Sequence, residues 1–294
     1  MAASSKPAKP ASAISETWAF HNDHWVRLSE LGIGLDDLGF VQAVTAVERL
    51  RTYAGEAFQV DRHLQRWRAT LAHLAIDVSR LTSPPINELL RRNADWVLKC
   101  GDVGITVCAT PGPISNPHPN LFLHLSRLDL DRVRRRRSQG QPLWVTDVVQ
   151  PPEQSWSRHA KVRCRLHYYL ADRQAAKWDL DAAGLLIDAD HSITETSIAN
   201  LAAVVDNTVI APPADQVLRG VSAQVVQNHA DKQGVTWEHR RLSVADLESA
   251  DEILLMGTDS GLWWVNRLGA ANASKRFEMG TVYRTLASAF PSTS

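Results

Sequence analysis

The sequence predicts an α+β protein of two domains, in which a smaller N-terminal domain precedes a larger C-terminal domain. Strand and helix patterns occur in groups, without the regular strand–helix alternation of a doubly wound sheet. At 294 residues, the chain is long enough for two medium domains. Composition changes abruptly at an arginine-rich run in residues 131–140, which we interpret as a linker. We therefore expect an N-terminal domain over residues 15–130 and a C-terminal domain over residues 141–294, after a disordered tail of residues 1–14.

The expected N-terminal domain begins with two turn signals. Residues 18–26 alternate apolar and polar side chains around the Asn22-Asp23 pair, which predicts a short hairpin. Residues 44–60 place β-branched side chains on both sides of Gly55, which predicts a second strand–turn–strand unit.

A helix follows the second unit. Asp61 can cap it, and Leu64, Trp67, Leu71 and Leu74 recur at helical spacing, which predicts one buried face. The rest of the domain is expected to be a helix over residues 86–98 and strands over residues 103–109 and 121–126.

The expected C-terminal domain starts with a strand over residues 142–149. Beyond Lys161 come an amphipathic helix and a hairpin-like segment whose second strand carries Glu195. A compact hairpin over residues 204–210 follows, and then a helix from an N-cap at Ser222 to a stop at Gly234. The last predicted elements are a short helix opened by a capping box at Ser243 and Asp246 and a buried strand over residues 253–256.

Bulk properties restrict the class of partner. The 32 basic and 32 acidic side chains cancel, which argues against a nucleic-acid or acidic membrane partner and favours a small molecule. Only three cysteines occur, without metal-binding spacing, so we expect a reducing cytoplasm and no disulfide framework. The first residues lack the apolar core of a signal peptide, and no run of apolar residues is long enough for a membrane helix.

Lys161 is the candidate for chemistry. Only seven lysines occur, and by itself a lysine before a helix is more often a solvated residue. A lysine that forms a Schiff base with pyridoxal phosphate needs an acid facing the pyridine nitrogen, a helix N-terminus for the phosphate and a further cation. The sequence has a candidate for each need: Glu195 on a strand, Gly220-Val221-Ser222 at a helix start, Thr258 at a strand end, and Arg66 on the helical face of His63.

These residues belong to a series of short motifs that runs across residues 18–270. The series is Asn22, Asp37-Leu38-Gly39-Phe40, Glu48 to Tyr53, His63-x-x-Arg66, Lys161, Glu195 to Asn200, Leu218 to Ser222 and Met256-Gly257-Thr258-Asp259. In order and spacing, the chain resembles the class IV pyridoxal-phosphate enzymes of fold type IV. That group includes branched-chain and D-amino-acid aminotransferases and aminodeoxychorismate lyase.

The resemblance implies a fold, a cofactor and residue roles. It implies an α/β sandwich-like N-terminal domain, a C-terminal domain with a β-barrel-like core, a homodimer, and pyridoxal 5'-phosphate between the domains. Lys161 would carry the cofactor and move the substrate proton, with a pKa lowered by burial. Glu195 would pair with the ring nitrogen, while Arg66, the Val221 backbone, Ser222 and Thr258 would hold the phosphate.

Several positions depart from the family pattern and concern the substrate. Leu166 stands where branched-chain aminotransferases usually have a tyrosine, whereas Arg165 is similar to what the lyases show. The segment before the Glu48 strand, residues 41–44, lacks the usual glycine. Arg51 and Arg165 are our candidates for a substrate carboxylate, because guanidinium groups suit bidentate pairing. The Trp263-Trp264 pair is either core or the wall of a hydrophobic pocket.

We therefore predict an aminotransferase that exchanges an amino group between an amino acid or primary amine and a 2-oxo acid by a ping-pong mechanism. Two alternatives stay open: a lyase that releases pyruvate from aminodeoxychorismate, and a catalytically silent binding protein with the same fold. Other classes are disfavoured. The sequence has no G-x-S-x-G elbow and no phosphate-binding glycine loop, and His191 near Asp188 has the polar surroundings of a turn, so we predict no metal site.

Overall fold

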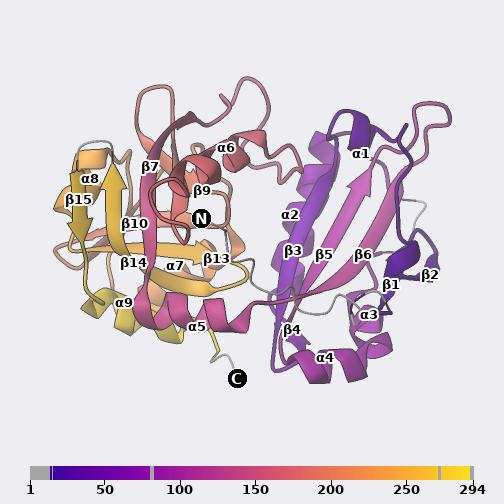
Figure 1. Ribbon diagram of the computed structural model, residues 1–294, viewed down its shortest axis with the longest axis horizontal. Coiled ribbons are helices and arrows are strands. Elements are labelled where there is room, and N and C mark those ends of the chain that lie inside the picture. Colours follow the sequence, from indigo (N-terminus) through magenta and orange to yellow (C-terminus); the bar gives the residue numbers. More distant parts are fainter. Residues whose placement is uncertain (1–13, 15, 80–82, 271–272, 292–294) are drawn as a thin grey trace, which may run out of the picture.

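The computed structural model describes residues 14, 16–79, 83–270 and 273–291, and Figure 1 shows two lobes, each built on its own β-sheet. The N-terminal lobe ends with β6, helix α5 follows, and the C-terminal lobe begins with β7. The tail predicted for residues 1–14 lies outside the described residues, apart from Ile14.

The N-terminal sheet is antiparallel throughout, in the order β2-β1-β6-β5-β3-β4. Its strands are β1 (Trp18–His21), β2 (His24–Arg27), β3 (Ala46–Tyr53), β4 (Glu56–Ala57), β5 (Val103–Thr110) and β6 (Asn120–Arg127). Both predicted turns are confirmed. His21 pairs with His24 around the first turn, and Tyr53 pairs with Glu56 around the second, where Gly55 has a φ of 81°.

The helices of this lobe are α1 (Leu38–Val41), α2 (Val60–His73), α3 (Ile86–Arg92) and α4 (Ala94–Cys100), and a short 3-10 helix covers Leu28–Glu30. Two predictions need correction. Gln59, and not Asp61, is the N-cap of α2, so Asp61 lies in the first turn and faces the positive end of the helix dipole. The single helix expected over residues 86–98 is two helices, because Asn93 leaves the helical path and donates to the Leu89 and Trp18 carbonyls.

The arginine-rich run between the two lobes forms a helix. Helix α5 (Leu130–Gln139) starts at Asp129, whose carboxylate accepts from the Arg132 amide at 2.9 Å. Arginine is a good helix former, and Val133 is buried against the rest of the protein. Arg137 donates to the Ser260 carbonyl, which ties this helix to the loop after β13.

The C-terminal sheet closes into a barrel of six strands, as predicted. They are β7 (Gln141–Val149), β8 (Ala183–Ile187), β9 (Ile193–Thr196), β10 (Asn200–Val205), β13 (Glu252–Gly257) and β14 (Gly261–Ala270). The pairing of Glu195 on β9 with Asn200 on β10 completes the ring. Three strands extend the sheet: β11 (Thr208–Ala211), β12 (Trp237–His239) and β15 (Ala273–Arg276).

Helices cover the barrel on two sides. They are α6 (Leu166–Ala175), α7 (Val221–Gln233), α8 (Val244–Ser249) and α9 (Thr281–Leu286), followed by a short 3-10 helix over Ala287–Ala289. The predicted stop at Gly234 and the capping box of Ser243 and Asp246 are confirmed. The predicted N-cap at Ser222 is wrong by two residues, because Gly220 takes that place and Ser222 lies in the first turn.

Apolar side chains form three cores. One lies between the N-terminal sheet and its helices, one fills the barrel, and the third packs β10 and β13 against α7 and α9. Tyr53 belongs to the third core, where its ring contacts Phe290, so this core joins the two lobes. Trp263 and Trp264 are 1% and 6% exposed and pack in the cores, which supports the core interpretation of this pair.

Candidate active site

A cavity at the junction of the barrel with α2 and α7 brings the predicted site residues together. All six residues predicted to hold the cofactor line it: Arg66, Lys161, Glu195, Val221, Ser222 and Thr258. Arg165, a candidate for the substrate carboxylate, lines it too. These side chains come from helices α2 and α7, the β9–β10 unit, the loop before α6 and the loop after β13, so only the folded chain makes them neighbours.

The Lys161 backbone is fixed by the N-terminal lobe. Its amide donates to the Thr70 hydroxyl of α2 at 3.1 Å, and its carbonyl accepts from the Val47 amide of β3 at 3.0 Å. Helix α6 begins only at Leu166, five residues later, so the lysine lies on a non-helical segment and not at the helix start. The base of this long, flexible side chain is thereby fixed at one point of the cavity wall.

The electrostatic surroundings of Lys161 favour a neutral amine. Burial and the positive charge of Arg66 lower the pKa of Lys161 to about 8, with Arg165 contributing and the carboxylates of Glu48 and Glu195 opposing. An ordinary lysine is almost fully protonated at neutral pH, whereas this one has an appreciable neutral fraction. The neutral amine is the form that attacks an aldehyde.

This pKa gives a testable pH dependence. We expect the rate at which the apoprotein attaches pyridoxal to rise about tenfold per pH unit below pH 8 and to level off above it, because only neutral Lys161 reacts. Stopped-flow absorbance with pyridoxal, which has no phosphate, measures it. In Arg66→Gln the midpoint should move upward, because a positive charge is removed. A wild-type midpoint at the ordinary lysine value, about pH 10, would contradict the assignment.

Glu195 on β9 is the buried acid of the cavity. Its carboxylate accepts hydrogen bonds from the Tyr168 hydroxyl at 2.7 Å, Gln150 Nε2 at 3.3 Å, Asn200 Nδ2 at 3.2 Å and the Leu218 amide at 3.2 Å. Burial raises the pKa of Glu195, and the hydrogen bonds from Tyr168 and Leu218 oppose the rise. No described residue forms an ion pair with this carboxylate within 4.0 Å, so a cationic ring nitrogen would complete its surroundings.

Arg66 on α2 is held by Glu48 on β3. The pair is bidentate, with Nε to Oε2 at 2.9 Å and Nη2 to Oε1 at 2.7 Å, and Nη1 donates to the Arg219 carbonyl at 2.9 Å. His63 Nδ1 lies 3.1 Å from the same carboxylate. Burial alone would raise the pKa of Glu48, but the charge of Arg66 and the hydrogen bond from His63 outweigh it and keep the carboxylate ionised. Two of the five guanidinium N–H groups stay available for a phosphate.

The start of α7 is suited to an anion. Gly220 is the N-cap and provides no side-chain acceptor, and Gln224 is the first residue whose amide bonds back to the Gly220 carbonyl. The amides of Val221 and Ser222 therefore point out of the helix start without intrahelical partners, next to the Ser222 hydroxyl. A Cβ at Gly220 would lie 1.9 Å from Asn200 Oδ1, so glycine is required for this close approach.

The chemical groups that line this cavity therefore fit pyridoxal phosphate. The cavity combines an amine of lowered pKa, a buried carboxylate without a cationic partner among the described residues, open helix amides and a guanidinium with unused donors. The amine can react with the aldehyde of that cofactor, the carboxylate can pair with its ring nitrogen, and the anion site can bind its phosphate.

The two predicted substrate arginines separate in the structure. Arg165 lines the cavity, and its guanidinium donates to the Ser197 carbonyl and lies over the Tyr168 ring. Arg51 is 1% exposed and does not line the cavity. Asp102, at 3.0 Å, and the Thr52 and Asp259 carbonyls take up its guanidinium. The role predicted for Arg51 is therefore not supported, because this side chain is a buried tie between the lobes.

Tyr168 and Gln150 are site residues that sequence reasoning missed. Tyr168 reaches Glu195 from α6, and Gln150 reaches it from the end of β7. The spacing of seven residues between Lys161 and Tyr168 does not predict a contact, because the segment between them is not helical. The sequence contained no signal for Gln150.

Known proteins are similar to this chain in sequence. Residues 45–268 match the family described as Amino-transferase class IV. A D-alanine aminotransferase of Staphylococcus epidermidis is 25% identical over 285 residues, which cover 93% of this chain and 96% of the relative.

Solved structures of other proteins have the same fold. The branched-chain amino acid aminotransferase of Escherichia coli superimposes with a TM-score of 0.80 at 18% identity over 92% of each chain. The branched-chain aminotransferase of Thermoproteus uzoniensis, solved with norvaline, gives 0.79 at 16% identity, again over 92% of each chain.

Proposed function

This chain belongs to the class IV aminotransferases, which depend on pyridoxal phosphate, and on that premise we propose that it exchanges an amino group between an amino acid and a 2-oxo acid by a ping-pong mechanism. The observation that carries the proposal is the single cavity in which Lys161 meets Glu195, Arg66 and the start of α7. Lys161 and the other residues predicted to hold the cofactor are all present in this cavity, which argues against the catalytically silent alternative.

We assign the roles as follows. Arg66, the Val221 amide, Ser222 and Thr258 bind the phosphate group, and Glu195 pairs with the ring nitrogen. When bound, the cofactor supplies an electron sink that makes the substrate Cα–H bond acidic. Ionised Glu195 maintains the positive charge on which that sink depends, and Tyr168 and Asn200 hold the carboxylate in place.

Lys161 is the proton carrier of the proposed mechanism. Its lowered pKa leaves an appreciable neutral fraction, so that Nζ could accept the Cα proton of a substrate whose amine had replaced Lys161 on the cofactor. The fixed Lys161 backbone keeps Nζ within a small region of the cavity. With the cofactor bound, Lys161 would move the proton between the substrate Cα and C4′ of the cofactor within each half of the exchange.

Arg165 is our proposed contact for the substrate carboxylate. It is the arginine of the predicted pair that lines the cavity, and it extends beside the Ser197 carbonyl at the β9–β10 turn. The relatives named above are aminotransferases of D-alanine or of branched-chain amino acids, so donors of both kinds belong in the first assays.

A direct assay tests the proposed reaction. Purified protein loaded with pyridoxal phosphate is incubated with D-alanine, L-leucine or L-glutamate and with pyruvate or 2-oxoglutarate, and the new amino acid is quantified by chiral chromatography. Aminodeoxychorismate is tested in parallel for release of p-aminobenzoate. We expect amino transfer without that release. Release without transfer would establish the lyase alternative, and a loaded protein that does neither would overturn the proposal.

We propose that the protein is a homodimer. Large apolar side chains are exposed on the α1 region of the N-terminal lobe and on α6, which Figure 1 shows toward the same end of the molecule. They are Ile33, Leu35, Phe40, Val41 and Ile114 in the first group and Leu166, Tyr169 and Leu170 in the second. Several exposed large apolar side chains at one end of a molecule are typical of an interface.

A pair of matched variants tests the dimer. We expect the wild type to have twice the 32.6 kDa mass of the chain in light scattering, and Leu35→Glu to weaken association at least about tenfold. Leu98→Glu is the control, because Leu98 is similarly exposed but lies on α4 at the other end of the molecule. Equal dissociation in both variants, or a monomeric wild type, would contradict the proposed interface.

The proposed location is the cytoplasm, where amino and 2-oxo acids are available as small-molecule partners. No helix among the described residues is both long and apolar enough to cross a membrane. We propose no nucleic-acid or membrane partner, since basic and acidic side chains balance.

A further inference from the structure

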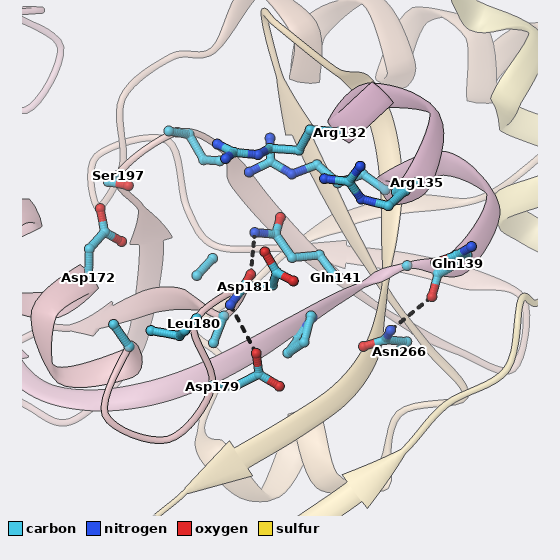
Figure 2. A pocket seen from close by; sticks show the side chains of 17 residues that line it. Arg132, Arg135, Gln139, Gln141, Asp172, Asp179, Leu180, Asp181, Ser197 and Asn266 are labelled. Carbon is cyan, nitrogen blue, oxygen red and sulfur yellow. Dashed lines mark hydrogen bonds between the residues drawn. The ribbon is translucent and has the colours of Figure 1, made fainter. Parts of the chain in front are cut away.

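The arginine-rich helix α5 borders a second cavity beside the active site. Arg132, Arg135 and Arg136 line one side of this cavity, which has a volume of about 490 Å³. Figure 2 shows the labelled Arg132 and Arg135 along one edge, with Asp179, Leu180 and Asp181 across from them. The volume is in the range of small-molecule sites.

The cavity adjoins the active site at the β9–β10 turn. Ser197 and Ile198, in the β9–β10 turn, line both this cavity and the one that contains Lys161. Figure 2 places Ser197 at the end of the pocket toward which the arginine side chains extend. A molecule in the arginine cavity therefore contacts the β9–β10 turn, in which the Ser197 carbonyl accepts a hydrogen bond from Arg165.

Arg132 and Arg135 are exposed and Arg136 is half-buried, and among the described residues none of the three has a carboxylate as close as the buried arginines have. Arg51, Arg66 and Arg158 each pair with a carboxylate at 3.0 Å or less. By contrast, Arg136 donates to the neutral Ser260 hydroxyl at 3.2 Å, and Arg132 lies 3.6 Å from Asp129, which is half exposed. Burial, with the nearby charge of Arg132, lowers the pKa of Arg136 to about 10, while the charges of Asp259, Asp129 and Asp181 oppose the shift.

The opposite wall carries carboxylates, but two of them are engaged. Asp179 forms an ion pair with Arg267, and Asp172 accepts from the Gly184 amide at 3.3 Å. Asp181 also lines the cavity and is exposed. Asn266 also lines the cavity, and its buried Oδ1 has no hydrogen-bond partner among the described residues. The cavity thus offers cations on one side and acceptors on the other.

We propose that this arginine cavity binds the acid group of a small molecule, a carboxylate or a phosphate, with Arg132, Arg135 and Arg136 as its ligands. Guanidinium groups bind both acids through paired N–H donors. The acid can be the distal group of a dicarboxylic substrate, which rests on the proposed aminotransferase function, or a free anion that binds beside the active site. The acceptors on the facing wall suit a ligand that also carries an amino or hydroxyl donor.

The experiment uses loaded enzyme, so that the phosphate site of the cofactor is filled. KM and kcat are measured for neutral donors, alanine and leucine, and for acidic donors, aspartate and glutamate. Titration calorimetry measures binding of inorganic phosphate. The variant is Arg132→Ala with Arg135→Ala, which leaves the more buried Arg136 in place. Arg134→Ala is the matched control, because Arg134 lies on the same helix, pairs with Asp131 and is not part of the cavity wall.

We expect the double variant to raise KM at least tenfold for the acidic donors and less than twofold for the neutral donors, with no change in the control. That result assigns the cavity to the substrate. Unchanged KM values with at least tenfold weaker phosphate binding would support the same site with a free anion as its ligand. If no donor reacts, the proposed function fails, and phosphate binding alone decides this inference. The proposal would be overturned if the double variant matched the wild type both in KM for every donor and in phosphate binding.

Discussion

Replacing Lys161 with alanine should reduce amino transfer at least about 10³-fold, the largest effect we expect from any single change. The substitution removes the only lysine among the residues that line the cavity with Glu195 and Arg66, and with it the group proposed to carry both the cofactor and the proton. Visible absorbance of the bound cofactor, borohydride reduction followed by mass spectrometry, and single-turnover kinetics measure the loss.

The control for this variant is Lys99→Ala. Lys99 is exposed on α4, and its loss should change neither absorbance nor rate. Added methylamine should restore part of the activity of Lys161→Ala, because a small amine can enter the vacated space and accept the proton. A Lys161→Ala protein that still attaches the cofactor covalently would show that another residue is the catalytic lysine.

Glu195→Gln should reduce kcat by about 10²-fold or more while the protein stays folded. The amide is nearly isosteric with the carboxylate, and its one oxygen can still accept from Asn200 and Leu218 while its NH2 group faces the Tyr168 hydroxyl, which can rotate to accept. It has no negative charge to oppose a protonated ring nitrogen. The measurements are single-turnover rates with a reactive donor, and a pH titration of the absorbance of the bound cofactor.

Tyr168→Phe tests whether Glu195 acts through its charge or through the hydrogen bonds that hold it. It removes one hydrogen bond to Glu195 and leaves the carboxylate in place, so we expect a loss of less than about tenfold. Thermal unfolding of both variants should stay near that of the wild type. Equal losses in Glu195→Gln and Tyr168→Phe would indicate that Glu195 acts through the hydrogen-bond network and not through its charge.

Local features of the sequence predicted most elements of the fold. The two N-terminal hairpins, the hairpin over residues 204–210 and the ends marked by Gly234 and Ser243 follow from turn and cap chemistry within a few residues. One error involves a distant contact: Asn93 divides a predicted helix because its side chain donates to the Leu89 carbonyl and to the Trp18 carbonyl of β1. The arginine run between the lobes forms a helix because Asp129 caps it and Val133 is buried.

The candidate cofactor residues were predicted from motif order, and the cavity that unites them shows that they are neighbours. Substrate residues were harder to predict. Arg51 and Arg165 look alike in the sequence, yet Arg51 is taken up by Asp102, next to β5, and only Arg165 lines the cavity. Tyr168, Gln150 and the arginine cavity depend on which faces of α5, α6 and β7 point toward one another.

Residue types at characteristic spacings along the chain were enough to predict the family, the candidate lysine, the acid and the helix start. Which arginines can reach a ligand depends on the folded chain, because contacts between residues far apart in the sequence occupy some guanidinium groups more fully than others. Asp102 and two backbone carbonyls take up Arg51 away from the cavity, whereas Arg66, although paired with Glu48, lines the cavity with two N–H groups unused.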